Sequence, residues 1–173
     1  MRIDKVKVYK FDELSEEAQE KAIEQLADVN VDCDWWESTY EDAAEVGIKL
    51  TEFDIGRGSY CRGNFTLDAE DVAKKIIDQH GACCPTHETA TTFLAEFSRC
   101  KTEFERTDEY DPEYEEFKDN RLYDGMANEF RCLILEDYRI ILEQEYGNLT
   151  GSEAIIETIK LNEYEFKEDG TQY

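Results

Sequence analysis

Acidic side chains recur at helical spacing in two segments of the chain, and this pattern restricts folding more than any other feature. The two rows are Glu16, Glu20, Glu24 and Asp28, followed by Glu37, Glu41 and Glu45. In an α-helix each row forms a column with a carboxylate about every 6 Å. Like charges four residues apart destabilise a helix by roughly 0.2–0.5 kcal/mol per pair, and Lys21 is the one cation between residues 11 and 45. The columns therefore oppose the helices that carry them, which favours a role in binding.

The chain as a whole is strongly acidic. Its 173 residues include 43 Asp or Glu against 19 Lys or Arg, which gives a net charge of −24. Such a polyanion is repelled by nucleic acids and anionic membranes and is attracted to basic protein surfaces. We therefore expect a basic protein or nucleoprotein partner and no direct binding to nucleic acid or membrane. Two rigid columns of carboxylates can imitate the phosphates of a nucleic acid, and an acidic, soluble surface without a partner is the alternative.

A second acidic region lies near residues 103–119, where Tyr110, Tyr114 and Phe117 alternate with carboxylates. Aromatic side chains anchor protein interfaces while charge accelerates encounter. The region is therefore a second candidate interface, and a solvated loop is the alternative. Its candidate contact residues are Asp108, Glu109, Asp111, Glu115 and Glu116.

Hydrophobic periodicity predicts an α+β fold. Alternation predicts strands over residues 5–11, 48–50, 60–67 and 163–166, with a bulge between Leu50 and Phe53. Apolar residues at helical spacing predict helices over about 16–29, 34–46, 69–80, 90–104, 111–147 and 150–161. The expected caps include Ser15, Gly47, and a capping box of Thr150 with Glu153. We expect one acidic domain over 1–173, with a small, mainly antiparallel sheet (N-terminal strand, central hairpin, C-terminal strand) covered by about six helices.

Residues 80–87 are the region in which chemistry is most plausible. His80, Cys83, Cys84 and His87 are residue types that bind zinc. Adjacent cysteines point in different directions, however, so a turn with small buried thiols is the favoured interpretation, and no metal or cofactor is expected. A nucleophile–base pair of Cys83 or Cys84 with His87 lacks an orienting third group. We find no GxSxG, HExxH or phosphate-loop motif, so we expect that the protein is not an enzyme.

The cysteines also bear on location. The sequence has 6 cysteines, no apolar run of membrane-spanning length and no apolar stretch near Met1 that would form a secretory signal. We therefore expect free thiols in a reducing compartment, and hence a cytoplasmic protein of the host cell.

Five segments of the sequence are distinctive: Phe11–Ala22, Asp34–Asp42, Asp54–Cys61, Glu153–Ile159 and Asn162–Phe166. Together they resemble small acidic proteins of unknown function encoded by bacteriophages and prophages, some of which are described as candidate antitoxins. The resemblance implies phage biology and no particular reaction.

The resemblance and the charge together predict an acidic inhibitor. It would bind the basic nucleic-acid-binding surface of a host defence complex, of the anti-CRISPR or anti-restriction type, by imitating a nucleic acid. One alternative is an antitoxin-like protein that neutralises a basic toxin. The other is a small thiol- or metal-dependent enzyme centred on residues 80–87.

Overall fold

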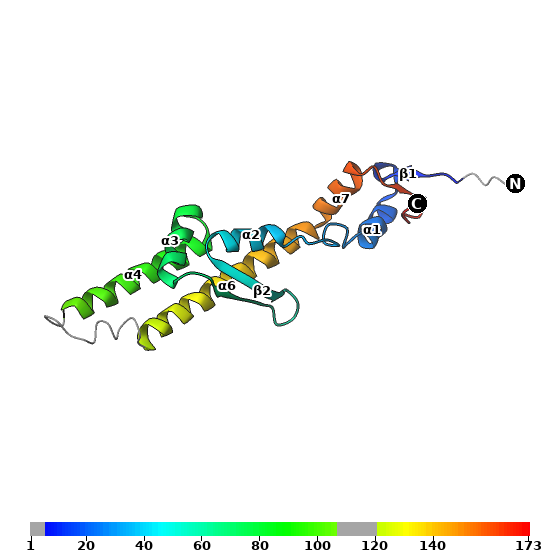
Figure 1. Ribbon diagram of the computed structural model, residues 1–173. Coiled ribbons are helices and arrows are strands. Elements are labelled where there is room, and N and C mark those ends of the chain that lie inside the picture. The colour runs from blue at the N-terminus through cyan, green and yellow to red at the C-terminus, as the bar shows by residue number, and fades with distance from the viewer. Residues whose placement is uncertain (1–5, 107–120) are drawn as a thin grey trace. The chain divides into compact units, whose positions relative to one another are not determined.

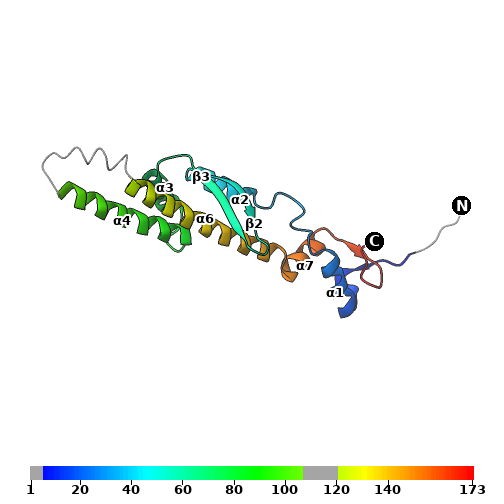
Figure 2. The same cartoon turned by 90° about the horizontal axis from the view of Figure 1, so that it is seen from below.

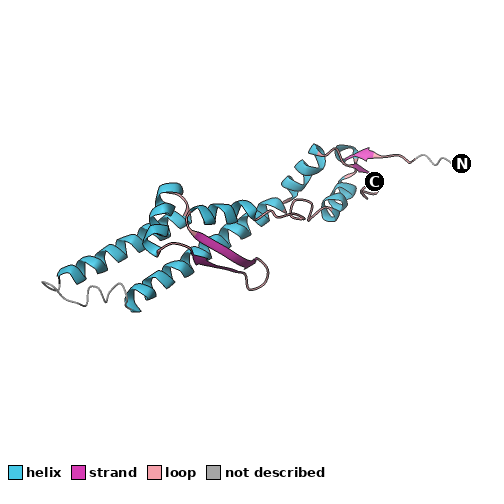
Figure 3. Ribbon diagram, in the orientation of Figure 1, coloured by secondary structure: helices cyan, strands magenta, loops and turns pink. Residues whose placement is uncertain are grey.

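Two separate clusters of buried apolar side chains organise the fold. The computed structural model describes residues 6–106 and 121–173, and over these residues it has six α-helices, one short 3-10 helix and four strands (Figure 3). The residues divide into two compact units. The first contains the described residues up to Trp35 together with Gln144–Tyr173, and the second contains Trp36–Glu143. The α+β class predicted from the sequence is confirmed.

The first unit joins the two ends of the chain. Strand β1 (Tyr9–Lys10) pairs antiparallel with β4 (Glu165–Phe166), and the 3-10 helix Phe11–Glu13 and helix α1 (Glu16–Gln25) follow β1. Helix α7 (Ser152–Leu161) precedes β4. The core of this unit is formed by small and large apolar side chains from these elements: Phe11, Leu14, Ala18, Ala22, Ile155, Ile159 and Phe166.

The second unit places a hairpin among helices. Helix α2 (Glu37–Glu45) leads into strands β2 (Ile48–Asp54) and β3 (Tyr60–Phe65), which pair antiparallel with the predicted irregularity between Leu50 and Glu52. Gly47 adopts a φ of +88°, as expected for a residue that ends a helix in the left-handed conformation. The four strands thus form two separate two-stranded sheets.

The rest of the second unit is helical. Helix α3 (Ala69–Gln79) is followed by α4 (Pro85–Arg106) and by α6 (Arg121–Leu149), whose residues up to Glu143 belong to this unit. Helices α4 and α6 run side by side in both views (Figures 1 and 2). The ring of Phe93 in α4 stacks on that of Phe130 in α6, with centroids 4.3 Å apart. Among the described helices, none combines the length and the apolar character that crossing a bilayer requires.

Several predicted boundaries near the chain ends are wrong. The strand expected over residues 5–11 is reduced to β1, because Phe11 enters the core and the Leu14 N–H bonds to its carbonyl in a 3-10 turn. Helix α1 ends at Gln25 and not near residue 29. Directly after Gln25, the Leu26 N–H is shared between two carbonyls of the last turn. Helix α2 begins at Glu37, three residues later than expected.

The connection between α6 and α7 also differs from the prediction. Helix α6 continues through Gly147 to Leu149. The Thr150 hydroxyl donates to the Tyr146 carbonyl at 2.8 Å, so it does not cap α7. Gly151 occupies the N-cap position, and the predicted capping box of Thr150 and Glu153 is therefore wrong.

Candidate functional site

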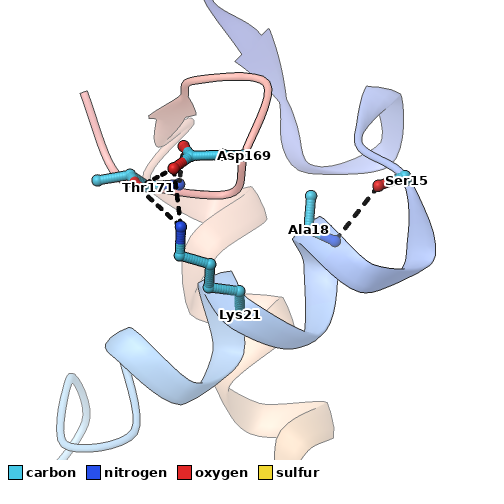
Figure 4. A network of polar contacts seen from close by, with 5 residues as sticks. All are labelled: Ser15, Ala18, Lys21, Asp169 and Thr171. Atoms are coloured by element: carbon cyan, nitrogen blue, oxygen red, sulfur yellow. Dashed lines mark hydrogen bonds and ion pairs between the residues drawn. The ribbon is translucent and has the colours of Figure 1, made fainter.

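The first acidic column lies on helix α1, which begins at a capped N-terminus. The Ser15 side chain accepts a hydrogen bond from the Ala18 N–H at 3.3 Å, which starts the helix at Glu16 (Figure 4). Ala18 is buried on the inner face, whereas Glu16, Glu20 and Glu24 are exposed. Because α1 ends at Gln25, Asp28 lies beyond the helix. The column therefore has three members on a helix instead of the predicted four.

The one cation of this segment turns away from the column. The Lys21 ammonium donates to the Asp169 carboxylate at 2.8 Å and to the Thr171 hydroxyl at 3.3 Å (Figure 4). These bonds attach the C-terminal turn to α1. The bond from Lys21, followed by the hydrogen bonds that the Thr171 N–H and hydroxyl donate to Asp169, lowers the pKa of the Asp169 carboxyl. Over the described residues, the carboxylates of Glu16, Glu20 and Glu24 have no ion-pair partner. Among the residues that the structure describes, no cation compensates the charge of this column.

The second column lies on α2 in the second unit. Glu37, Glu41 and Glu45 are exposed, while the opposite face of the helix is buried through Thr39 and Ala43. Lys75 approaches this helix but donates to the Glu45 backbone carbonyl, at 3.1 Å. In the part of the chain that the structure describes, the three carboxylates lack ion pairs.

The second predicted interface lies outside the described residues. Its candidate contacts were Asp108, Glu109, Asp111, Glu115 and Glu116, all within residues 107–120. The candidate site within the described residues consists of the columns on α1 and α2.

A row of polar side chains crosses the second unit near residues 80–87. The His80 imidazole lies 2.7 Å from the Thr86 hydroxyl through Nδ1 and 3.5 Å from the Asp42 carboxylate through Nε2. Tyr138 donates to the other Asp42 oxygen at 2.9 Å, and the Cys84 sulfur lies 3.0 Å from the Thr86 hydroxyl. The row connects α2, α4 and α6 to the end of α3.

This row has some features of a catalytic triad, but its reactive groups are enclosed. Thr86 is fully buried and the His80 side chain is 8% exposed, so a substrate cannot reach the hydroxyl or the imidazole. Burial, and then the nearby Asp42 carboxylate, raises the pKa of the Tyr138 hydroxyl far above its usual range, so it remains a hydrogen-bond donor. Inside this packed core the row provides hydrogen-bond partners for the Tyr138 and Thr86 hydroxyls, whereas the buried Nε2 atom of His80 has only the long approach to Asp42 and no hydrogen bond.

The four residues considered for zinc do not converge on one point. Cys83 is exposed, and the His87 ring lies 3.5 Å from the Thr91 hydroxyl, away from the row that contains His80 and Cys84. Within the described residues, no group of three or more His, Cys, Asp or Glu side chains is arranged to hold a metal ion.

Sequence reasoning missed Asp42, Thr86 and Tyr138 as members of this row. Tyr138 gives the one usable signal, because it lies four residues after Ile134 on the apolar stripe of α6 and is fully buried. A buried tyrosine hydroxyl usually finds a hydrogen-bond partner. The sequence does not indicate which residue provides it.

Comparison of the chain with protein-family models, with curated proteins and with solved structures finds no match.

Proposed function

We propose that the protein is an acidic inhibitor that binds the basic, nucleic-acid-binding surface of another protein. The observation that supports this most directly is the set of exposed carboxylates at helical spacing on α1 and α2, which have no ion pairs over the described residues. A folded protein gains nothing from like charges held four residues apart. A basic cleft that normally binds phosphates would bind these carboxylates favourably, because they replace the counterions that the cleft otherwise attracts.

The position of Lys21 strengthens the proposal. A lysine within an acidic helix usually relieves the repulsion of its neighbours. Here the ammonium bonds to Asp169 and Thr171 instead. The column on α1 is consequently not neutralised by the lysine of its own helix, and its carboxylates form a row of negative charges, as phosphates do along a nucleic acid.

The proposed target class follows from the resemblance to phage proteins. We propose a host defence complex with a basic cleft, such as a restriction enzyme or a CRISPR effector. The protein would occupy the cleft and exclude DNA or RNA from it.

The test compares two variants that each lose three negative charges. The column variant carries Glu20→Gln, Glu24→Gln and Glu41→Gln. The control variant carries neutral residues at exposed positions outside the columns, Asp78→Asn, Glu157→Gln and Glu168→Gln. Native protein, control and column variant are immobilised and exposed to lysate of the bacterial host, and the retained proteins are identified.

We expect a nucleic-acid-binding protein to be retained by the native chain and the control and to be lost from the column variant. With the purified target, native protein should displace its DNA or RNA in a competition assay, and the column variant should do so less well and with a weaker dependence on salt. If the two variants retain the target equally, binding depends on net charge or on another surface, and the proposal is wrong. A captured toxin would instead support the antitoxin-like alternative.

A further inference from the structure

A groove with an apolar floor lies between α4 and α6 in the second unit, where the two helices run side by side (Figures 1 and 2). Its volume is about 330 Å³. The apolar side chains that line it are Phe93, Met126, Phe130 and Leu133. The rings of Phe93 and Phe130 stack on one another at the floor, and the Leu133 side chain beside them is 52% exposed.

Carboxylates surround this floor on both helices. Glu88 and Glu96 come from α4, and Glu129 and Asp137 come from α6. Asp137 accepts a hydrogen bond from the Thr89 hydroxyl at 2.7 Å, and partial burial raises its pKa. The described residues that line the groove include neither lysine nor arginine.

The length of the groove sets the size of its occupant. Along α6 the lining residues run from Met126 to Asp137. The eleven helical rises between these two residues, at about 1.5 Å each, extend over roughly 16 Å. This matches about three turns of a second helix, and an apolar groove between two helices is a common docking site for an amphipathic helix.

We infer that the groove binds a basic amphipathic helix of a protein partner. A bulky apolar side chain of the partner would bury Leu133 and the aromatic floor, while flanking lysine or arginine side chains would reach the carboxylates on the rim. Charge selects this occupant, because a second copy of the chain carries a net charge of −24 and an anionic lipid surface is also repelled. The inference rests on the proposed function, since it names a second way in which the same basic partner is held.

The experiment uses defined peptides in place of the unidentified partner. One fluorescein-labelled, 14-residue helical peptide contains leucine and lysine at amphipathic spacing, and the second has serine in place of every leucine at the same charge. Their affinities are measured by fluorescence anisotropy with the full-length protein. The groove variant is Leu133→Asp, and the matched control is Leu161→Asp, at a leucine that is 76% exposed outside the groove.

The effect expected of Leu133→Asp on peptide affinity is opposite in sign to the effect of its added negative charge alone. Each variant becomes more acidic, so unspecific attraction predicts equal or tighter peptide binding for both. We expect Leu133→Asp to weaken the leucine–lysine peptide roughly three- to tenfold, because the exposed half of a leucine is no longer buried. Leu161→Asp should stay within twofold of the native protein, and the serine–lysine peptide should bind more weakly to all three.

A charge reversal provides a second, independent variant. Glu129→Lys places a cation on the rim and should weaken the leucine–lysine peptide, whereas Glu157→Lys, at an exposed position on α7, should weaken it less. Far-UV circular dichroism of each variant verifies that the helices are retained.

Three outcomes would overturn the inference. The first is a Leu133→Asp variant that binds the leucine–lysine peptide as tightly as the native protein. The second is equal binding of both peptides, which would leave the proposed role of the columns untouched. The third is a native dimer that Leu133→Asp dissociates, because a second copy would then occupy the groove. Equal retention of the target by the column variant and the control in the capture experiment would contradict the proposed function and would not bear on the groove.

Discussion

Replacing the middle glutamate of the first column tests whether these carboxylates oppose folding. In α1, Glu20 has Glu16 and Glu24 four residues away on either side and Glu17 three residues away. Glu20→Gln therefore removes three repulsive pairs of roughly 0.2–0.5 kcal/mol each and should raise the free energy of unfolding by about 0.6–1.5 kcal/mol. Asp28 does not enter this estimate because it lies beyond the end of the helix.

The second column provides a smaller expected effect of the same sign. Glu41 has Glu37 and Glu45 four residues away and no charged residue at three. Glu41→Gln should therefore raise the free energy of unfolding by about 0.4–1.0 kcal/mol. The control is Glu129→Gln, at an exposed position in α6 without charged neighbours three or four residues away, which should change stability by less than about 0.3 kcal/mol.

The assay is urea unfolding at low salt and again at about 1 M NaCl, where the Debye length falls to about 3 Å. Both gains should shrink strongly at high salt, because screening already weakens the repulsion in the native protein. A variant that is less stable than the native protein, or a gain that persists at high salt, would refute the reasoning. A less stable variant would mean that the carboxylates make stabilising contacts, and a gain that persists at high salt would mean that charge repulsion is not its cause. Either result would remove the argument that these carboxylates are kept for binding and not for folding.

Three further predictions follow from individual contacts. Gly170→Ala should destabilise the protein by about 2–5 kcal/mol in urea unfolding, because Gly170 has a φ of +81° and an added Cβ would lie 2.9 Å from the Ala18 carbonyl carbon. Gly58→Ala, at a φ of +90° but in open space, should lose only the backbone term of about 1–2 kcal/mol, and equal losses would contradict the steric argument. Iodoacetamide at pH 8 should modify the exposed Cys132 well before Cys61, as measured by peptide mass mapping. Burial raises the pKa of the Cys61 thiol to about 11, and a rise of two pH units in the pKa lowers the reactive thiolate fraction about 100-fold. The pKa of Asp169 is lower in the folded than in the unfolded protein. The ionised Asp169 therefore stabilises the fold above pH 3.8, and this stabilisation is lost as the pH falls below that value. In acid unfolding curves, Asp169→Asn should lose less stability over this pH range than the native protein does.

The helices were predictable where a buried stripe continues through the whole element. Val72, Ala73 and Ile76 are fully buried in α3, and the same holds for Ile134 in α6. The ends were less predictable because tertiary contacts decide them. Phe11 continues an alternating pattern in the sequence, yet its ring packs against Phe166, with centroids 6.3 Å apart, and this contact accompanies the early end of β1.

The candidate site was predictable only in its exposed part. The positions of Glu16, Glu20 and Glu24 follow from helical periodicity, which is a local property. The groove between α4 and α6 requires residues more than 30 positions apart to meet, as Phe93 and Phe130 do. A single sequence contains no local pattern that reports such a meeting, so neither the groove nor its acidic rim was expected.

Neighbouring acids on α2 show how the structure separates carboxylates that the fold uses from those that it does not. Asp42 accepts a hydrogen bond from the buried Tyr138 and lies beside His80, so the core explains its presence. Glu41 precedes it in the sequence, is exposed, and has no ion pair among the described residues. Asp169 is likewise explained by its bond to Lys21. Exposed acids without an ion pair also occur elsewhere among the described residues, as at Asp78 and Glu157, but those on α1 and α2 are distinguished by their regular spacing of four residues. Such spacing repels within each helix and gives no benefit to folding, and it is what selection for an external, positively charged partner would leave.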